Sequence, residues 1–172
     1  MAPPSTASDL TAADRIVLGI GGIAVHRGGG GCIVTHALGS CVGITIWDPV
    51  ARVGGLLHAQ LPAGAGNPER AQREPGIFVD LAVPELFRSA YALGAEKGRL
   101  RVAVAGGASI GTTGNDLFSI GKRNLTVVRK LFWQNSILVS GEDTGGDRPR
   151  TMSIDFATGH TLIASQGQHY AI

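Results

Sequence analysis

The feature that most constrains the fold is a pair of β-rich segments separated by a short turn. Val42–Trp47 (VGITIW) and Val53–Leu61 (VGGLLHAQL) are rich in β-branched and other apolar residues, which is typical of strands. Asp48–Arg52 lies between them and has Pro directly after Asp, a pattern typical of a turn. We therefore expect an antiparallel hairpin, which places this part of the chain in a sheet.

The remaining patterns add strands around two helices. Apolar residues recur at helical spacing over Phe78–Leu93 and from an N-capping Ser119 to about Trp133, whereas Ala63–Gly76 is polar and is predicted to be a loop. This order predicts a layered α+β domain, whose single mixed, mostly antiparallel sheet carries the two helices. Six further strands are expected: Arg15–His26 with a break at a Gly pair, Cys32–Thr35, Leu100–Val104, Ile137–Ser140, Thr151–Phe156 and Thr161–Ala164.

Composition narrows the class of protein. The chain has 172 residues, of which 44% are hydrophobic, so we expect a flexible leader at 1–13 and one domain at 14–172. The net charge of +2 comes without a dense basic run, so nucleic acid is not an expected partner. No secretory signal and no long apolar span is evident, which favours a cytoplasmic protein with free thiols. Gly106–Gly114 lacks the residues of a phosphate-binding loop, so we predict a structural loop beside a cleft and no cofactor.

The hairpin makes a geometric prediction about Cys41 and His58. If its turn centres near Val50, Cys41 lies opposite a residue near 59, and His58 lies within one or two positions of that residue. A neighbouring imidazolium lowers the pKa of a thiol, and the thiolate attacks an amide carbon while the His hands a proton to the leaving amine. This pairing predicts a nucleophile and base, with a thiolate–imidazolium pair.

The residues around this pair are expected to contact substrate. Gly39 permits an unusual backbone angle just before the Cys, and the loop that it shares with Ser40 is predicted to aim backbone N–H groups at an oxyanion. Gly107 and Ala108, in the Gly-rich loop, are predicted to line the same cleft.

Simpler interpretations of the same residues stay open. A Cys at the start of a strand is most often a small buried hydrophobic residue, and a His on a strand is more often a hydrogen-bonded edge residue than a base. A zinc site is a further alternative, although the spacing of its candidate ligands is not typical of one. Those ligands are Cys32, His36, Cys41 and His58.

The chain resembles the CheD family of chemoreceptor glutamine deamidases. The family pattern has an L-G-S-C block, a strand, and G-G-x-x-H followed closely by L-P, and Leu38–Cys41, Gly54–His58 and Leu61-Pro62 fit it. The resemblance covers most of the chain from near residue 15 onward. Further matching blocks are Asp80 with Ala82, Gly106–Ala108, Ile120-Gly121 with Arg123-Asn124, Glu142-Asp143 with Gly145-Gly146, and Thr158-Gly159.

The resemblance implies an activity and a site. The family's nucleophile falls on Cys41, its base on His58 and its third active-site residue on Thr35. It implies a protein-glutamine glutaminase that converts Gln on the cytoplasmic helices of methyl-accepting chemotaxis receptors to Glu through a Cys thioester, releasing ammonia. It also implies an α/β sandwich similar to the fold of the cytotoxic necrotizing factor deamidases. Some members of the family bind a CheC-type phosphatase.

The chain departs from the family pattern at a few positions. Ala59 and Gln60 stand where the family usually has an aromatic residue and Met, Phe78 replaces Tyr, and Pro149 replaces Gly. These changes are predicted to bear on receptor docking or on the choice of target. They also motivate an alternative, in which the protein acts as a weakly catalytic or non-catalytic adaptor that docks to a CheC-type phosphatase or a receptor.

Overall fold

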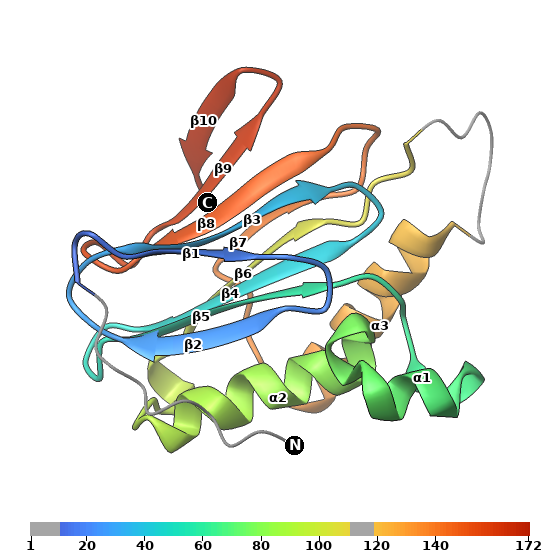
Figure 1. Ribbon diagram of the computed structural model, residues 1–172, viewed down its shortest axis with the longest axis horizontal. Helices are drawn as coiled ribbons and strands as arrows, with labels where there is room; N and C mark the ends of the chain where they lie inside the picture. The colour runs from blue at the N-terminus through green and yellow to red at the C-terminus, as the bar shows by residue number, and fades with distance from the viewer. Residues whose placement is uncertain (1–10, 111–118) are drawn as a thin grey trace.

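The fold consists of two β-sheets stacked face to face, with helices covering the outer face of one of them (Figure 1). The computed structural model describes residues 11–110 and 119–172. Each sheet has five strands, and most neighbouring strands are antiparallel. The α+β class and the mostly antiparallel pairing are therefore confirmed, whereas the prediction of one sheet is wrong.

The first sheet has the order β1-β3-β8-β9-β10, in which only β1 and β3 run parallel. Burial alternates along β8, as expected for a strand with one face on the core and one on solvent. A β-bulge interrupts the pairing of β3 with β8 between Thr35 and Leu38. The strands are β1 (Arg15–Leu18), β3 (Cys32–Leu38), β8 (Arg150–Asp155), β9 (Thr161–Ser165) and β10 (Gln168–Ala171).

The second sheet has the order β2-β5-β4-β6-β7 and contains the predicted hairpin at its centre. Val42 pairs with Ala59 and Asp48 pairs with Val53, so the antiparallel hairpin is confirmed. Every residue of β4 and β5 is buried because the first sheet covers one face and helices cover the other. The strands are β2 (Ile23–Arg27), β4 (Val42–Asp48), β5 (Val53–Ala59), β6 (Arg101–Gly106) and β7 (Gly141–Thr144).

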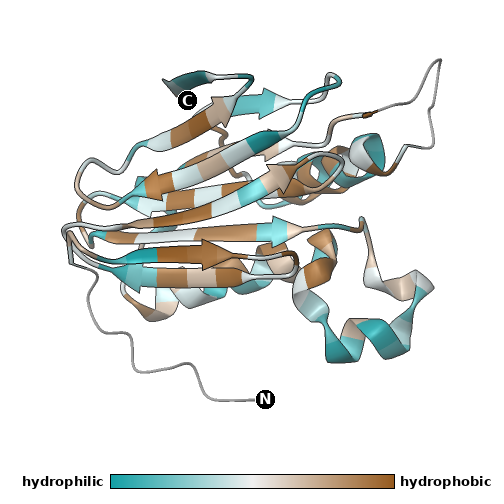
Figure 2. Cartoon of the chain, turned by 45° about the horizontal axis from the view of Figure 1, so that its top comes forward, coloured by the Kyte–Doolittle hydropathy of each residue, from teal (hydrophilic) through white to brown (hydrophobic). Residues whose placement is uncertain are grey.

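Two long helices, α2 (Val79–Ala92) and α3 (Ile120–Gln134), pack on the second sheet, as predicted. Ser119 caps α3, since its Oγ accepts a hydrogen bond from the N–H of Lys122. A shorter helix, α1 (Pro68–Arg73), lies beside them and is largely hydrophilic in Figure 2. Single 3₁₀ turns occur at Gly64–Gly66, Pro75–Ile77 and Lys97–Arg99.

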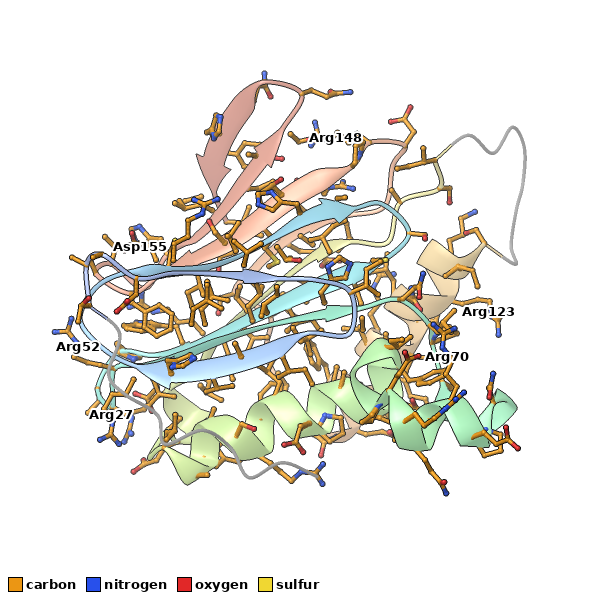
Figure 3. All side chains as sticks on the ribbon, in the orientation of Figure 1. Arg27, Arg52, Arg70, Arg123, Arg148 and Asp155 are labelled. Carbon is orange, nitrogen blue, oxygen red and sulfur yellow. The ribbon has the colours of Figure 1, made fainter. Side chains whose placement is uncertain are left out.

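The layers enclose two apolar cores. One lies between the second sheet and the helices, where Leu57, Leu86 and Phe132 are buried. The other lies between the two sheets, where the rings of Trp47 and Phe156 meet edge to face at 5.5 Å. Figure 2 shows the corresponding hydrophobic stretches along the strands of both sheets, and Figure 3 shows the side chains that fill the spaces between the layers. The second core also contains Cys41, which places this residue between the sheets.

Several sequence expectations need correction. Arg15–His26 forms two strands in different sheets, because the chain turns at Gly19–Gly22 and crosses from one sheet to the other. Ala63–Gly76 is not wholly a loop, since α1 begins there with Asn67 as its cap. The strand expected at Ile137–Ser140 is Gly141–Thr144 instead, and β10 was not expected at all.

Some expectations concern residues outside the described parts of the chain. The leader at 1–13 falls mostly on residues 1–10, and the Gly-rich loop 106–114 extends into 111–118, so neither is fully described. Within residues 11–110 and 119–172, no helix combines the length and apolar character needed to cross a bilayer.

Candidate active site

The predicted site residues come from both sheets and meet at one end of the molecule. Thr35 lies on β3 of the first sheet, and His58 lies on β5 of the second. Cys41 follows the loop that leaves β3 and directly precedes β4. In Figure 1 this is the end to which the arrowheads of β3 and β5 point.

The hairpin register makes Cys41 and His58 neighbours. Gly43 pairs with His58 and Val42 with Ala59, so continuing the ladder by one residue puts Cys41 opposite Gln60. Cys41 and His58 are then diagonal neighbours on one face of the sheet, where such residues lie about 7–8 Å apart at the backbone. Both side chains are buried, with 7% of Cys41 and 2% of His58 exposed.

Thr35 fixes the tautomer of His58. The Thr35 hydroxyl donates to the carbonyl oxygen of Leu18 at 2.8 Å, and its oxygen lies 2.7 Å from Nδ1 of His58. A hydroxyl has a single proton, and that proton is used on Leu18, so Nδ1 must carry its own proton and donate to Thr35. A neutral imidazole protonated at Nδ1 has its lone pair on Nε2.

The second ring nitrogen of His58, Nε2, has different surroundings from Nδ1. It is buried and has no hydrogen-bond partner among the described residues. Burial also lowers the pKa of His58, which keeps the ring neutral and its Nε2 able to accept a proton. The lone pair on Nε2 is therefore free to accept a proton from a neighbouring donor, which is what a general base requires.

Burial acts on Cys41 in the opposite direction. It raises the pKa of the thiol, although a hydrogen bond from the residue's own backbone N–H partly offsets this. Burial thus disfavours the charged form of each group in the expected thiolate–imidazolium pair.

The backbone is strained at the bulge of β3, just before the loop that leads to Cys41. The residue in the left-handed region is Ala37, with φ of 58°, whereas Gly39 is not among the residues with positive φ. The Gly39 N–H donates to the Ala37 carbonyl at 2.9 Å, which closes a tight turn at the bulge. A non-glycine residue held in this region is a feature often found at active sites.

Gly106 and Gly107 pack against the backbone of Cys41. Gly106 has φ of 97°, and a Cβ there would lie 2.2 Å from the carbonyl oxygen of Cys41, so only glycine fits. The N–H of Gly107 donates to that same oxygen at 2.8 Å, and the N–H of Ala108 donates to Gly39 O at 2.8 Å. The loop therefore holds the segment around Cys41 in place.

These bonds decide which expected substrate contacts are available. The N–H groups of Gly39, Gly107 and Ala108 all donate within the protein, and Ala108 is fully buried. Among the hydrogen bonds of the described residues, none is donated by the N–H of Ser40, which is half-buried. Of these four expected contact residues, Ser40 is thus the one whose backbone N–H makes no hydrogen bond to another described residue.

The zinc alternative is not supported by the geometry. Cys32 and His36 lie on the outer face of the first sheet, in a hollow shared with His169, whereas Cys41 and His58 lie between the sheets. Within the described part of the chain, no group of three or more His, Cys, Asp or Glu residues could hold a metal ion.

Comparisons with known proteins agree with the resemblance. Residues 60–165 match the family model described as CheD chemotactic sensory transduction. The chain is 42% identical over 152 residues to the "Probable chemoreceptor glutamine deamidase CheD 1" of Syntrophus aciditrophicus, covering 88% of this chain and 94% of that protein. This chain belongs to the CheD family.

Other relatives of this CheD-family chain carry similar names. The "Probable chemoreceptor glutamine deamidase CheD 2" of Anaeromyxobacter dehalogenans is 42% identical over 153 residues, with 89% of this chain and 96% of that protein covered. The "Chemoreceptor glutamine deamidase CheD" of Thermotoga maritima is 38% identical over 151 residues, with 88% and 92% covered. The similarity thus extends over nearly the whole length of these proteins.

The departures from the CheD pattern have different surroundings. Ala59 and Phe78 are buried, so their side chains pack inside the protein and present no surface to a partner. Gln60 is half-buried beside the site, and Pro149 is exposed. Direct effects on a target are therefore expected from Gln60 and Pro149 rather than from the two buried residues.

One residue of this CheD-family site was not singled out from the sequence as part of the site. Asn124 on α3 is fully buried, and its Nδ2 donates to the carbonyl oxygens of Ser40 and Gln60, both at 2.9 Å. The available signal was its position, because Asn124 lies one turn before the buried Val128 on the inward face of an amphipathic helix. A polar residue at such a core position requires buried partners.

Proposed function

We propose that this protein is a chemoreceptor glutamine deamidase, which hydrolyses Gln side chains of methyl-accepting chemotaxis receptors to Glu and releases ammonia. The names of its relatives support the substrate class. The observation that carries the chemistry is the Thr35–His58 hydrogen bond, because it leaves an unprotonated Nε2 on the ring beside Cys41.

In the first half of the proposed reaction, Sγ of Cys41 attacks the carboxamide carbon of the Gln side chain. The thiol proton moves to Nε2 of His58, so a C–S bond forms without a free thiolate in the resting protein. The tetrahedral intermediate then breaks its C–N bond, and the imidazolium gives its proton to the departing nitrogen. Ammonia leaves, and a thioester joins Cys41 to the substrate.

In the second half, water replaces ammonia. Nε2 of His58, again unprotonated, takes a proton from water as the water oxygen attacks the thioester carbon. The C–S bond breaks, the proton returns to sulfur, and a glutamate side chain is released. Thr35 keeps its bond to Nδ1 in both halves, which stabilises the imidazolium that forms transiently in each.

The developing oxyanion is proposed to be met by the N–H of Ser40. The loop that carries this group is more accessible than the reacting side chains, because Gly39 and Ser40 are half-buried whereas Cys41 and His58 are buried. Loss of a single oxyanion donor typically costs about 10²–10³ in kcat. Gly107 and Ala108 serve this step indirectly, because they hold the loop through Cys41 and Gly39.

Trapping of the thioester tests this proposal. Hydroxylamine added while the protein acts on a receptor fragment should intercept the acyl group and give a hydroxamate at the target Gln, detected by peptide mass spectrometry. The Cys41→Ala variant should give neither hydroxamate nor ammonia. Hydroxamate formation that continues in Cys41→Ala would sink the nucleophile assignment.

Further parts of the proposal rest on the family alone. Binding of a CheC-type phosphatase, a cytoplasmic location, and a fold similar to the cytotoxic necrotizing factor deamidases stay predictions. A pull-down with a CheC-type phosphatase tests the first of these. If Cys41→Ala retains both that binding and the parent's signalling output, the adaptor alternative is favoured over catalysis.

A further inference from the structure

We propose that Asn124 is a positioning residue, which sets the spacing between Cys41 and His58 by bridging the two chain segments that carry them. This inference rests on the proposed deamidase function. It assigns to α3 a role in the reaction, beyond covering the sheet.

The bridge lies where the β4–β5 ladder ends. The last pair of the ladder is Val42 with Ala59, so the next residues on each side, Cys41 and Gln60, lie beyond it. Asn124 reaches both segments there, since one Nδ2 donates to Ser40 O and to Gln60 O at 2.9 Å each. A primary amide has two N–H protons, so this single side chain connects the two segments just beyond the last pair of the ladder.

The orientation of the amide is fixed by its partners. Both partners are backbone carbonyl oxygens, which only accept, so the nitrogen must face them. Oδ1 is buried and has no partner among the described residues, which means that the NH₂ group alone makes these bonds. An isosteric carboxylate at this position would face the two carbonyl oxygens without a proton to offer.

The helix that carries Asn124 is itself held against the nucleophile loop. A Cβ at Gly121, one turn earlier, would lie 2.5 Å from Ala108 O and 2.6 Å from Gly107 O, so the helix backbone packs directly on this loop. Gly107 in turn holds the carbonyl of Cys41. The bridge therefore joins both segments to a rigid element rather than to a flexible one.

Loss of the bridge is expected to reduce turnover more than substrate binding. Cys41 and His58 are diagonal neighbours, so their approach depends on how closely the two strand ends are held. A misplacement of about 1 Å can cost about 100-fold in rate. Because Asn124 is fully buried behind the loop, it does not contact substrate, and KM should change little.

The test uses the full-length protein and a receptor fragment, with kcat and KM measured below the unfolding transition of every variant. Asn124→Asp should lower kcat by about 10- to 100-fold, because the two strand ends are no longer held at the same spacing. Its KM should stay within about twofold of the parent's. In Asn124→Ser, which removes the amide without adding a charge, the acid limb of the pH profile should stay at the parent's position, because the Thr35–His58 bond remains. Asn135→Ala is the matched control, since Nδ2 of Asn135 donates to Leu131 O on the exposed end of the same helix.

The outcomes separate this inference from the function on which it rests. If Cys41→Ala is inactive while folded Asn124→Asp keeps the parent's kcat, the positioning role is wrong and the deamidase function stands. If Asn124→Asp does not fold, Asn124→Ser takes its place with the same expected loss of kcat, and an unchanged kcat overturns the role. If the parent converts no Gln, the proposed function fails and this inference fails with it.

Discussion

Replacement of Thr35 by Val tests how the base is prepared. Valine keeps the shape of threonine and removes the hydroxyl, so Nδ1 of His58 loses the oxygen to which it donates at 2.7 Å. In the parent, the Leu18 carbonyl uses the only hydroxyl proton and thereby dictates the tautomer. In Thr35→Val nothing holds the ring proton on Nδ1, and a ring protonated on Nε2 cannot accept the Cys41 proton.

The magnitude follows from burial. Thr35 is fully buried and only 2% of His58 is exposed, so solvent does not replace the lost partner. A buried donor left without an acceptor costs about 1–3 kcal/mol. Since about 1.4 kcal/mol corresponds to tenfold in rate, kcat/KM should fall by about 5- to 150-fold. Thr35→Ser retains the hydroxyl and should stay within a few-fold of the parent.

The assay combines kinetics with a spectroscopic readout. Ammonia release from a receptor fragment gives kcat/KM, and ¹⁵N NMR of the imidazole shows which ring nitrogen carries the proton. Thr45→Val is the control, because Thr45 also makes a buried hydroxyl bond, to Thr161, and lies away from the catalytic residues. If Thr35→Val keeps both the parent's kcat/KM and its Nδ1 proton, Thr35 does not set the tautomer of His58.

Three further predictions follow from the same contacts. The acid limb of the pH profile of kcat/KM should lie below pH 6.5, because burial lowers the pKa of His58. The alkaline limb should lie above pH 9.0, because burial raises the pKa of Cys41. An alkaline limb near neutrality would instead indicate a preformed ion pair. Gly106→Ala should lower the free energy of unfolding in urea by about 1–3 kcal/mol and reduce kcat, since the new Cβ meets Cys41 O; unchanged values would contradict this contact. Asp48 is buried, and although burial opposes its ionisation, hydrogen bonds from Arg99 and backbone N–H groups hold its pKa well below 3.8. The resulting stability is present above pH 3.8 and is lost as pH falls below it, so the Tm of the parent should fall in that range more than that of Asp48→Asn, and equal losses would be inconsistent with it.

The hairpin could be predicted because its information is local. Two β-rich segments and a Pro-containing turn set both the strands and an approximate register, and the register alone makes Cys41 and His58 neighbours. The two main helices were equally predictable from apolar spacing and, for α3, from its Ser119 cap. These features depend on residues that are close together in the chain.

The division into two sheets depends on distant pairings and was not predictable. The sequence of Arg15–His26 is strand-like on both sides of its Gly pair, and only the partners of each half decide that β1 joins β3 while β2 joins β5. The turn between them is held by a remote strand, because Gly21 N–H donates to His58 O at 2.7 Å. A local sequence pattern does not indicate which distant strand a segment pairs with.

The outer members of the site show the same limit. Thr35 could be named only from the family resemblance, because its bond to His58 crosses from one sheet to the other. Asn124 reaches Ser40 and Gln60, which are 84 and 64 positions away in the chain. The raised pKa of Cys41 and the lowered pKa of His58 both follow from burial between two sheets. They could not be predicted, because only one sheet was expected.

Conversion of receptor Gln to Glu by Cys41 is tested most directly by mass spectrometry of a receptor fragment after incubation with the protein. Replacement of the amide NH₂ by OH gives a small, defined mass gain at each converted Gln. The parent is expected to produce this gain at particular glutamines, and Cys41→Ala is expected to produce none. Conversion by Cys41→Ala at the parent's rate, or no conversion by the parent, would contradict the account.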